Sequence, residues 1–191
     1  MPETYAPLII FTVVVLLPVL WLILTYNAFI RLGNHCREAW AQIDTELKRR
    51  YDLIPNLVET VRGYAKHERE VFQRVTEART RALASTGSPQ SQAQDENVLV
   101  GALRGLLAVV ENYPDLKASQ NFLSLQRELT NTEDRIQAAR RFYNANVRDF
   151  NTRVEVIPSN LVAALFGFRK QEYFEIESAT ERAVPQVQLQ P

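Results

Sequence analysis

The sequence has little cysteine and little glycine, and it has no excess of charge of either sign. Cys36 is the single cysteine, so the chain cannot form an intramolecular disulfide, and this fits a reducing compartment. The 22 basic and 22 acidic residues cancel, so the net charge gives no indication of a nucleic-acid partner. Six glycines are few for a turn-rich β fold, which favours a helical protein.

Residue patterns typical of enzymes and metal sites are also missing. His67 and Glu68 begin an HExxH-like string, but the fifth position is Val71, so no zinc-binding pair of histidines forms. Neither histidine has a glutamate three residues earlier, which excludes the Glu-x-x-His ligands of helical di-iron proteins. The sequence contains no GxxxxGK[ST], GxGxxG or GxSxG string. We therefore expect a protein that is not an enzyme and that has no metal and no cofactor.

Charge is absent from a long stretch at the N-terminus. Residues 4–30 contain no charged side chain, and a helix needs roughly 20 apolar residues to cross a bilayer. The residues before this stretch lack the basic charge of a signal peptide. The sequence predicts a short segment over residues 1–5 and an uncleaved transmembrane helix over residues 6–30. Arg31 and Arg37 follow the helix and no basic residue precedes it, which places the later residues in the cytoplasm.

Beyond this stretch, apolar residues recur at alternating steps of four and three. Such a repeat is typical of a helix with one continuous face packed on partner helices, as in a coiled coil. Pro55 has no N–H to donate within a helix, but the repeat keeps its phase across it. We therefore predict a helix that runs through Pro55, from about residue 34 to 84. The positions of the repeat are Cys36, Trp40, Ile43, Leu47, Arg50, Ile54, Leu57, Val61, Tyr64, Glu68, Val71, Val75, Ala78 and Ala82.

The rest of the chain reads as shorter helices and loops. The predicted segments are a loop over 85–94, helices over about 95–113 and from about 117–119 to Pro158, and a short helix LVAALF capped by Ser159 or Asn160 and stopped by Gly167. We expect an all-α fold, in which the transmembrane helix is followed by an antiparallel bundle of three to four long helices over residues 31–168. Residues 169–191 form a C-terminal tail that we predict to be extended or disordered.

Three long motifs resemble the LemA family. They are LKRRYDLIPNLVETVRGYAKHE, AVVENYPDLKASQNFLSLQRELTNTEDRIQAARRFYNANV and FNTRVEVIPSNLVAALFGF. The resemblance extends from about Tyr26 to Glu177. It implies a bacterial protein with an N-terminal transmembrane helix and an α-helical bundle, similar to a magnetosome-associated protein. It also implies a link to envelope protein quality control beside a membrane metalloprotease. The resemblance supplies no catalytic residue.

Polar residues in these motifs are the first candidates for an interaction site. Arg49, Arg50 and Asn56 surround Pro55. They either form a polar binding strip or make buried hydrogen bonds that fix helix register. Arg50 falls on the packed face itself, where we expect it to pair with a carboxylate or to extend to the rim. The later helix adds Asn121, Asn144 and Asn151, for which the same two interpretations apply.

The apolar segment LVAALFGF is the other candidate. It is too short to cross a membrane. Phe166 and Phe168 would anchor it in a lipid interface or in the groove of a partner, or else the segment closes the open end of the bundle.

Together these features predict a membrane-anchored helical scaffold. We expect it to contact the lipid bilayer, to self-associate as a homo-oligomer, and to bind no nucleic acid. The alternative, which follows from the resemblance, is an adaptor for a membrane metalloprotease. The predicted location is the bacterial inner membrane, crossed once, with the N-terminus outside and the helical domain in the cytoplasm.

Overall fold

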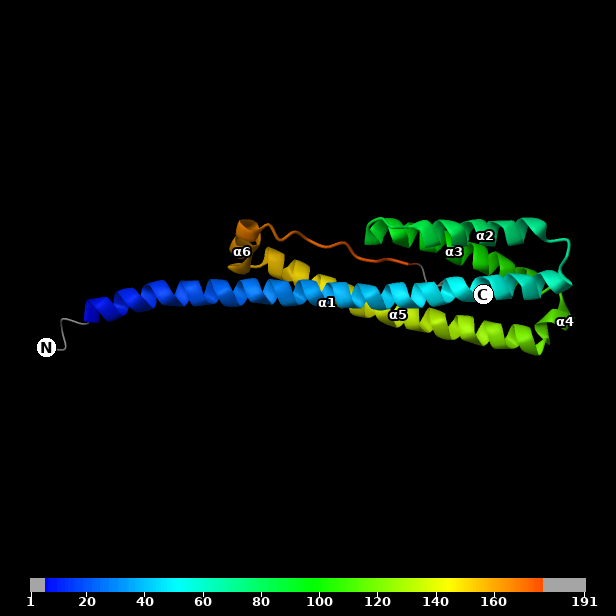
Figure 1. The fold of residues 1–191 in the computed structure, drawn as a ribbon, viewed down its shortest axis with the longest axis horizontal. Helices are drawn as coiled ribbons and strands as arrows, with labels where there is room; N and C mark the ends of the chain where they lie inside the picture. Colours follow the sequence, from blue (N-terminus) through cyan, green and yellow to red (C-terminus); the bar gives the residue numbers. More distant parts are fainter. Residues whose placement is uncertain (1–5, 177–191) are drawn as a thin grey trace, which may run out of the picture. The chain divides into compact units, whose positions relative to one another are not determined.

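The computed structural model describes residues 6–176, with side chains from residue 11 onward. Within this range the regular structure is helical and contains no strand, so the all-α prediction is confirmed. The predicted segment 1–5 lies outside the described residues. The helices are α1 (Ala6–Tyr64), α2 (Arg69–Ala84), α3 (Pro89–Val110), α4 (Pro114–Lys117), α5 (Gln120–Glu155) and α6 (Ser159–Phe166), as labelled in Figure 1.

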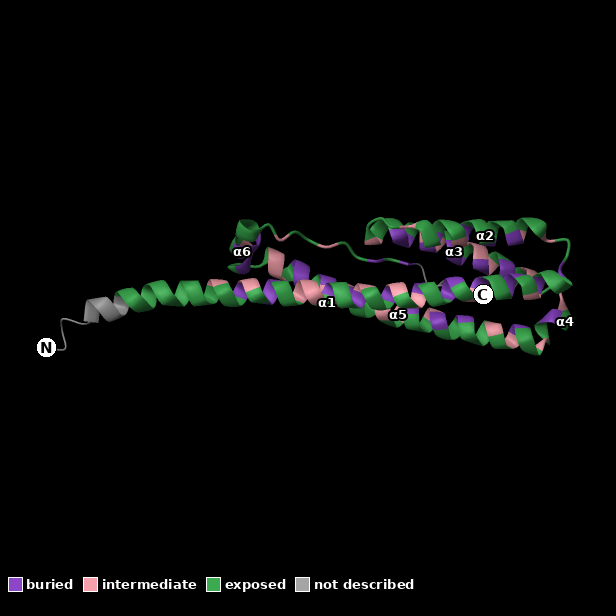
Figure 2. Cartoon of the chain, viewed as in Figure 1, coloured by how far each residue is buried: buried purple, intermediate pink, exposed green. Residues whose placement is uncertain are grey.

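A single helix, α1, contains both the apolar N-terminal stretch and Pro55. Its backbone is helical from Ala6 to Tyr64, so the prediction that the helix passes through Pro55 is confirmed. Ile54 and Leu57, on either side of the proline, are both buried, because the packed face keeps its phase there. The side chains of residues 11–20 are all exposed (Figure 2). By length and composition α1 is able to cross a membrane.

The predicted end of this helix at residue 84 is wrong. The helix ends at Tyr64, and a turn over residues 65–68 leads into α2. In the turn, the amide of Glu68 bonds to the carbonyl of Ala65 over 3.3 Å. The apolar repeat is weakest here: Tyr64 is 48% exposed and the next repeat position is the charged Glu68. The chain can therefore turn at this point without exposing a large buried side chain.

The predicted loop over residues 85–94 is too long, because α3 begins at Pro89. Ser88 is the N-cap, and its hydroxyl accepts a hydrogen bond from the amide of Ser91 over 3.4 Å. Proline suits the first helical position because its missing N–H would have no partner there. The earlier start places Glu96 about two turns into the helix and not at its beginning, and its side chain is buried.

By the contacts among its Cα atoms the chain divides into two units. The second unit, Trp40–Asn144 with Glu172–Pro191, contains the bundle formed by α2, α3, α4 and the adjoining parts of α1 and α5. In this unit α2 and α3 lie side by side (Figure 1). Its fully buried apolar side chains include Ile43, Leu47, Ile54, Leu57, Leu99, Leu106, Leu116, Phe122 and Ile136.

The first unit, Met1–Ala39 with Ala145–Gln171, contains the beginning of α1, the end of α5 and α6. Helix α6 ends at Gly167, whose φ of 73° is the left-handed conformation that glycine adopts readily. The expected cap from Ser159 or Asn160 is wrong, because the N-cap is Pro158. The Ser159 hydroxyl instead donates to main-chain carbonyls, at 2.7 Å from that of Arg153.

The described part of the C-terminal tail, residues 169–176, has no helix, and its last residues pack within the second unit. In the second unit, Phe174 and Ile176 are buried, and the Phe174 ring packs edge-on to Trp40 with ring centroids 5.1 Å apart. Whether the tail as a whole is extended or disordered stays a prediction. Residues 177–191, which the same prediction covered, lie outside the described residues.

Candidate functional site

The most unusual feature of the second unit is a buried charged centre around Arg50. This side chain comes from the packed face of α1 and is fully buried. Its guanidinium contacts the carboxylate of Glu96 on α3, and its Nη1 donates to both carboxylate oxygens of Glu133 on α5, over 2.9 and 3.1 Å. The Tyr51 hydroxyl donates to the other oxygen of Glu96. Of the two alternatives for Arg50, pairing with carboxylates is the one that the structure has.

Burial controls the electrostatics of this centre. It raises the pKa of the Glu96 carboxyl, against the opposing effects of Arg50 and the Tyr51 hydroxyl. Burial alone would lower the pKa of Arg50, but Glu133 and Glu96 outweigh it and raise that pKa. Burial and the Glu96 carboxylate also raise the pKa of Tyr51 well above its usual value. The arginine therefore stays charged and the tyrosine stays protonated, so the centre joins α1, α3 and α5 by charge-assisted hydrogen bonds.

The main-chain carbonyl freed by Pro55 has a partner from another helix. Proline has no N–H, so the carbonyl of Tyr51, four residues earlier, loses its bond within α1. Arg79 of α2 donates its Nε–H to this carbonyl over 2.6 Å. The proline therefore creates an acceptor that fixes α2 against α1.

An open polar groove lies between α1 and α5 in the same unit, beside this centre. It is lined by Thr45, Lys48, Arg49, Asp52, Leu53, Asn56, Glu128, Asn131, Thr132 and Arg135. The α1 residues recur every three to four positions and so share one helix face, as do those of α5. Thr132 is buried, and Glu133, the next residue, holds Arg50. We call this feature the α1–α5 groove.

The two ends of the α1–α5 groove differ in charge. Arg135 lies 3.7 Å from Glu46 of α1, which places it at the same end as Lys48 and Arg49. The other end carries Asp52 and Glu128. From Thr45 to Asn56 the groove is about 16 Å long at 1.5 Å per residue. A groove of this length with a basic and an acidic end suits a polypeptide of complementary charge.

The nine predicted site residues have different surroundings. Arg49 and Asn56 line the α1–α5 groove, whereas Arg50 is buried and Pro55 is exposed outside the groove lining. Asn121 is exposed near the start of α5. Whether any of them contacts a partner stays a prediction. The remaining four, described next, are Asn144, Asn151, Phe166 and Phe168.

Asn144 and Asn151 hold the C-terminal segment through its backbone. In the second unit, Asn144 donates to the carbonyl of Phe174 over 3.0 Å and accepts from its amide over 2.9 Å. In the first unit, Asn151 makes the same two bonds with Gln171, over 2.9 and 2.8 Å. Each side-chain amide thus makes the pair of main-chain hydrogen bonds that a neighbouring β-strand would make with that residue.

Phe166 and Phe168 belong to an aromatic cluster in the first unit. The Phe168 ring stacks on Phe29 of α1 with centroids 4.6 Å apart, and Phe166 lies 4.8 Å from Tyr26. Phe150 of α5 packs against both Phe29 and Phe168.

Sequence reasoning missed the partners of Arg50 and of Pro55. Glu96 was detectable in principle, because it lies on the apolar face of α3 with Leu99 and Leu103. Glu133 and Arg79 lie on half-exposed positions that carry no such signal. Within residues 6–176, no group of three or more His, Cys, Asp or Glu side chains is arranged to hold a metal ion.

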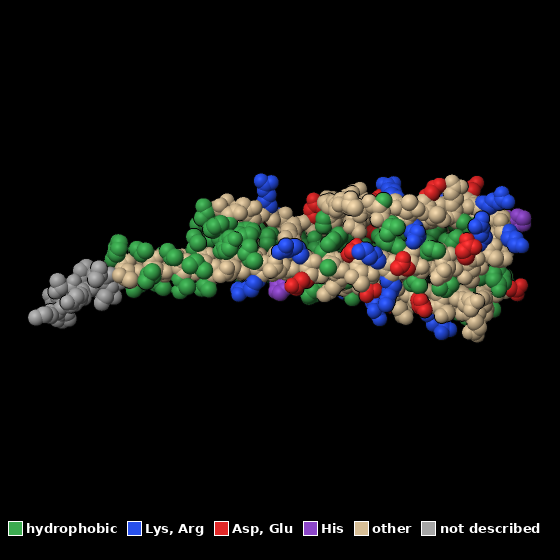
Figure 3. Space-filling view, in the orientation of Figure 1, with side chains coloured by type: hydrophobic (Ala, Val, Ile, Leu, Met, Phe, Trp, Pro, Cys, Tyr) green, Lys and Arg blue, Asp and Glu red, His purple; other side chains and the backbone are tan. Residues whose placement is uncertain are grey.

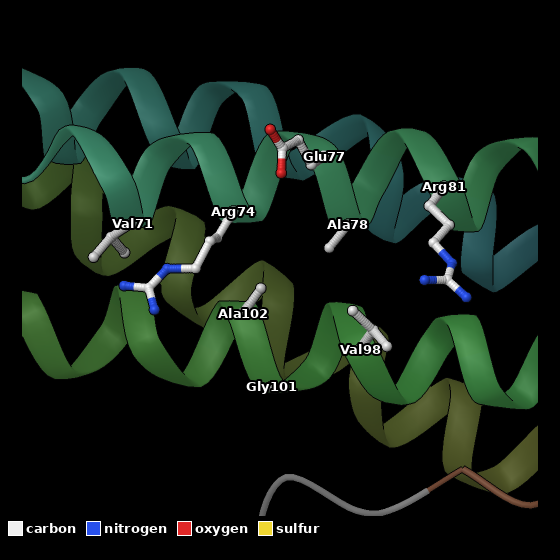
Figure 4. Close-up of a pocket in the computed structure, with 8 residues that line it drawn as sticks. All are labelled: Val71, Arg74, Glu77, Ala78, Arg81, Val98, Gly101 and Ala102. Carbon is white, nitrogen blue, oxygen red and sulfur yellow. The ribbon is translucent and has the colours of Figure 1, made fainter.

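A second, smaller groove lies between α2 and α3. Figure 4 shows Arg74 and Arg81 reaching from α2 toward α3, on either side of Ala78. On α3 the lining includes Val98 and Gly101. Arg81 pairs with Asp95 of α3 over 2.6 Å, so this groove is partly bridged by contacts within the hairpin itself.

Comparison with known proteins identifies the family. The magnetosome protein MamQ of Magnetospirillum gryphiswaldense is 25% identical over 193 residues, covering 87% of this chain and 71% of its own. Two MamQ proteins of Paramagnetospirillum magneticum are each 26% identical over 193 residues, covering 88% and 71%. The protein LemA of Metamycoplasma hominis is 29% identical over 138 residues, covering 72% and 63%. The LemA family model matches residues 39–189, and the chain therefore belongs to the LemA family.

Proposed function

We propose that this membrane-associated LemA-family protein is a non-enzymatic scaffold that self-associates through the α1–α5 groove. The observation that carries the proposal is the separation of charge along this groove. Lys48, Arg49 and Arg135 lie at one end, and Asp52 and Glu128 lie at the other. Two copies related by a two-fold axis would place each basic end against the acidic end of the partner, as an isologous interface requires.

The surface pairs already present do not prevent this exchange. Lys48 contacts Asp44 over 2.7 Å and Arg135 contacts Glu46 over 3.7 Å, and their basic side chains are more than half exposed. Exposed pairs of this kind contribute about 0–1 kcal/mol, so they can be replaced by pairs across an interface at little cost. The buried centre beneath stiffens the groove, because Arg50 links α1 to α5.

Charge reversal tests the proposal in full-length protein solubilised in detergent. One variant carries Lys48→Glu and Arg49→Glu, and the other carries Asp52→Lys and Glu128→Lys. In a dimer of either variant alone, side chains of the same charge would face each other at both contacts. Light scattering after size-exclusion chromatography should therefore show monomers. Mixed together, the two variants present opposite charges at both contacts and should form heteromers. Monomeric wild-type protein, or failure of the mixture to associate, would contradict self-association through this groove.

The proposed location is the inner membrane, crossed once by the first part of α1, with the helical domain in the cytoplasm. Arg31 and Arg37 after the apolar stretch support this orientation. A cysteine in place of Leu83, which is 52% exposed on α2 and lies outside the groove, should resist a membrane-impermeant maleimide in intact cells and react after lysis, in a Cys36→Ser background. Labelling in intact cells would reverse the orientation.

The alternative function, an adaptor for a membrane metalloprotease, would use the same groove for a different polypeptide. In either case we expect the contacts to come from the residues that line the groove, with the fully buried Arg50 holding α1 against α5. A photo-crosslinker at Asn131 discriminates the two functions in native membranes. Adducts with a second copy of the chain support the scaffold, and adducts with a protease, weakened by the two charge-reversal variants, support the adaptor.

A further inference from the structure

Helix α6 is apolar on the face it buries and on the face it exposes. Val162 and Ala163 are each 2% exposed, whereas Leu161 is 67% and Leu165 is 69% exposed. No residue of Ser159–Phe166 is charged. Figure 3 shows hydrophobic side chains gathered over α6 and the adjoining part of α1. A helix that is apolar all round is typical of a protein interior or a membrane, not of a surface in water.

Ring contacts fix where α6 lies along α1 in the first unit. Phe166 packs on Tyr26, with centroids 4.8 Å apart, and Phe168 stacks on Phe29. Up to this point α1 is exposed around its circumference, and beyond it one face is buried. The change falls between Leu24, which is 57% exposed, and Thr25, which is 3% exposed. Helix α6 therefore covers α1 from the first turn at which the apolar stretch becomes buried.

The distance along α1 places this contact at the boundary of a bilayer. The twenty residues that separate Ala6 from Tyr26 rise about 30 Å, which is the thickness of the hydrocarbon core. Tyrosine is a residue enriched at that boundary. Phe166 joins α6 to Tyr26, so the exposed leucines of α6 would then lie at the depth of the lipid headgroups and the first acyl carbons.

The charge near this boundary fits a lipid surface. After the apolar stretch, the first unit carries twice as many basic as acidic side chains, although the whole chain has no net charge. The basic residues are Arg31, Arg37, Arg148, Arg153, Arg169 and Lys170, and the acidic residues are Glu38, Asp149 and Glu155. Arg169 and Lys170 come directly after the α6 segment. Basic residues beside an amphipathic or apolar helix attract anionic headgroups.

We propose that α6 is an interfacial membrane helix, whose Leu161 and Leu165 insert into the cytoplasmic leaflet beside the end of the α1 span. The inference rests on the proposed crossing of the bilayer by α1. It adds a second membrane contact, which comes from the last of the described helices, whereas the first comes from α1. The occupant of the exposed face is phospholipid, so a second chain or another protein is not needed to cover it.

Site-directed spin labelling of full-length protein tests the inference, with one chain per nanodisc containing anionic phospholipid. In a Cys36→Ser background, single cysteines replace Leu161, Leu165, Leu20 in the α1 stretch, or Leu83. Leu83 is the matched control: it is a leucine, 52% exposed, on α2 of the bundle. The measurement is the ratio of collisions with oxygen, which concentrates in lipid, to collisions with a water-soluble nickel chelate. Circular dichroism checks that each labelled chain is folded.

Labels at Leu161 and Leu165 should show a severalfold higher oxygen-to-nickel ratio than the label at Leu83, and a lower one than that at Leu20. A ratio equal to that of Leu83 means that the face lies in water and overturns the inference. Low collision rates with both reagents mean that protein covers the face, which also overturns it. If Leu20 itself collides mainly with nickel, the proposed span has failed. Photoactivatable phospholipid should in addition modify residues 157–166 of the unsubstituted chain.

Discussion

The Nε–H of Arg79 points at the carbonyl oxygen of Tyr51 from 2.6 Å away, and this is the carbonyl that Pro55 deprives of its donor. The cost of a proline inside a helix is about 3 kcal/mol, part of which is the lost hydrogen bond. Here the bond is replaced by one between two helices. The proline therefore contributes to the packing of α2 on α1, because the carbonyl that it leaves free accepts a hydrogen bond from Arg79.

A double-mutant cycle measures this relationship. Arg79→Ala should lower the free energy of unfolding by about 1–3 kcal/mol, because it leaves a carbonyl without a donor. In a Pro55→Ala background the restored N–H satisfies Tyr51, so the same substitution should cost less. Arg74→Ala is the control, since Arg74 bonds to Glu70 in its own helix. Equal costs of Arg79→Ala in both backgrounds, by urea unfolding, would exclude the coupling.

Removal of Glu96 should be among the most destabilising single changes in the bundle. Glu96→Gln leaves the buried Arg50 with one anionic partner, and breaking such a pair costs about 3–5 kcal/mol. Glu133→Gln should cost less, because the Glu133 side chain is 23% exposed and water partly screens its charge. The double variant Arg50→Met with Glu96→Leu should recover much of the loss. The order of melting temperatures by circular dichroism checks all three.

Alkaline pH should destabilise the bundle through Tyr51. Burial and Glu96 raise its pKa in the folded protein, whereas an unfolded tyrosine loses its proton near pH 10. Above about pH 10 the folded state therefore binds one proton more than the unfolded state, and stability falls by up to about 1.4 kcal/mol per pH unit. Tyr51→Phe should remove this part of the slope. An unchanged slope in urea titrations at pH 9 to 11 would show that Tyr51 ionises normally.

Asn144→Ala should release the C-terminal segment without disturbing α5. Both hydrogen bonds to Phe174 would be lost, for about 1–3 kcal/mol in total. The Phe174 amide should exchange with deuterium much faster, and Trp40, which Phe174 covers, should become more accessible to quenchers. Asn121→Ala, at an exposed position of the same helix, should change stability by less than about 0.5 kcal/mol. Slow exchange at Phe174 in Asn144→Ala would show that the buried aromatic ring alone holds the segment.

Hydrophobic periodicity predicted the continuity of α1 but not its end. The phase of the repeat is preserved across Pro55 because the helix continues, so that prediction succeeded for the physical reason given. The phase is also preserved across residues 65–68, where the helix stops, because α2 has an apolar face of its own in Phe72, Val75 and Ala78. Periodicity alone does not distinguish one long helix from two that follow each other in phase.

Partners of polar groups were harder to predict than helices. Arg50 was recognisable as a charge on a packed face, but its partners come from α3 and α5, and the polar sequence SQAQDE hid the first turns of α3. The asparagine contacts were hidden for a different reason: Asn144 and Asn151 bind main-chain atoms, which every residue carries. A sequence pattern contains no signature for such a contact, so the packing of the C-terminal segment appears only in three dimensions.

The contact between Trp40 and Phe174 has a consequence for biosynthesis. A ring encoded early is covered by a ring encoded late, and the two lie edge to face in the finished domain. A nascent polypeptide that ends before Phe174 leaves one side of the indole uncovered, even after the helices have formed and Tyr143 has packed on Trp40. Premature termination before this ring would thus leave apolar surface around Trp40 open to solvent, and exposed apolar surface of this kind promotes aggregation.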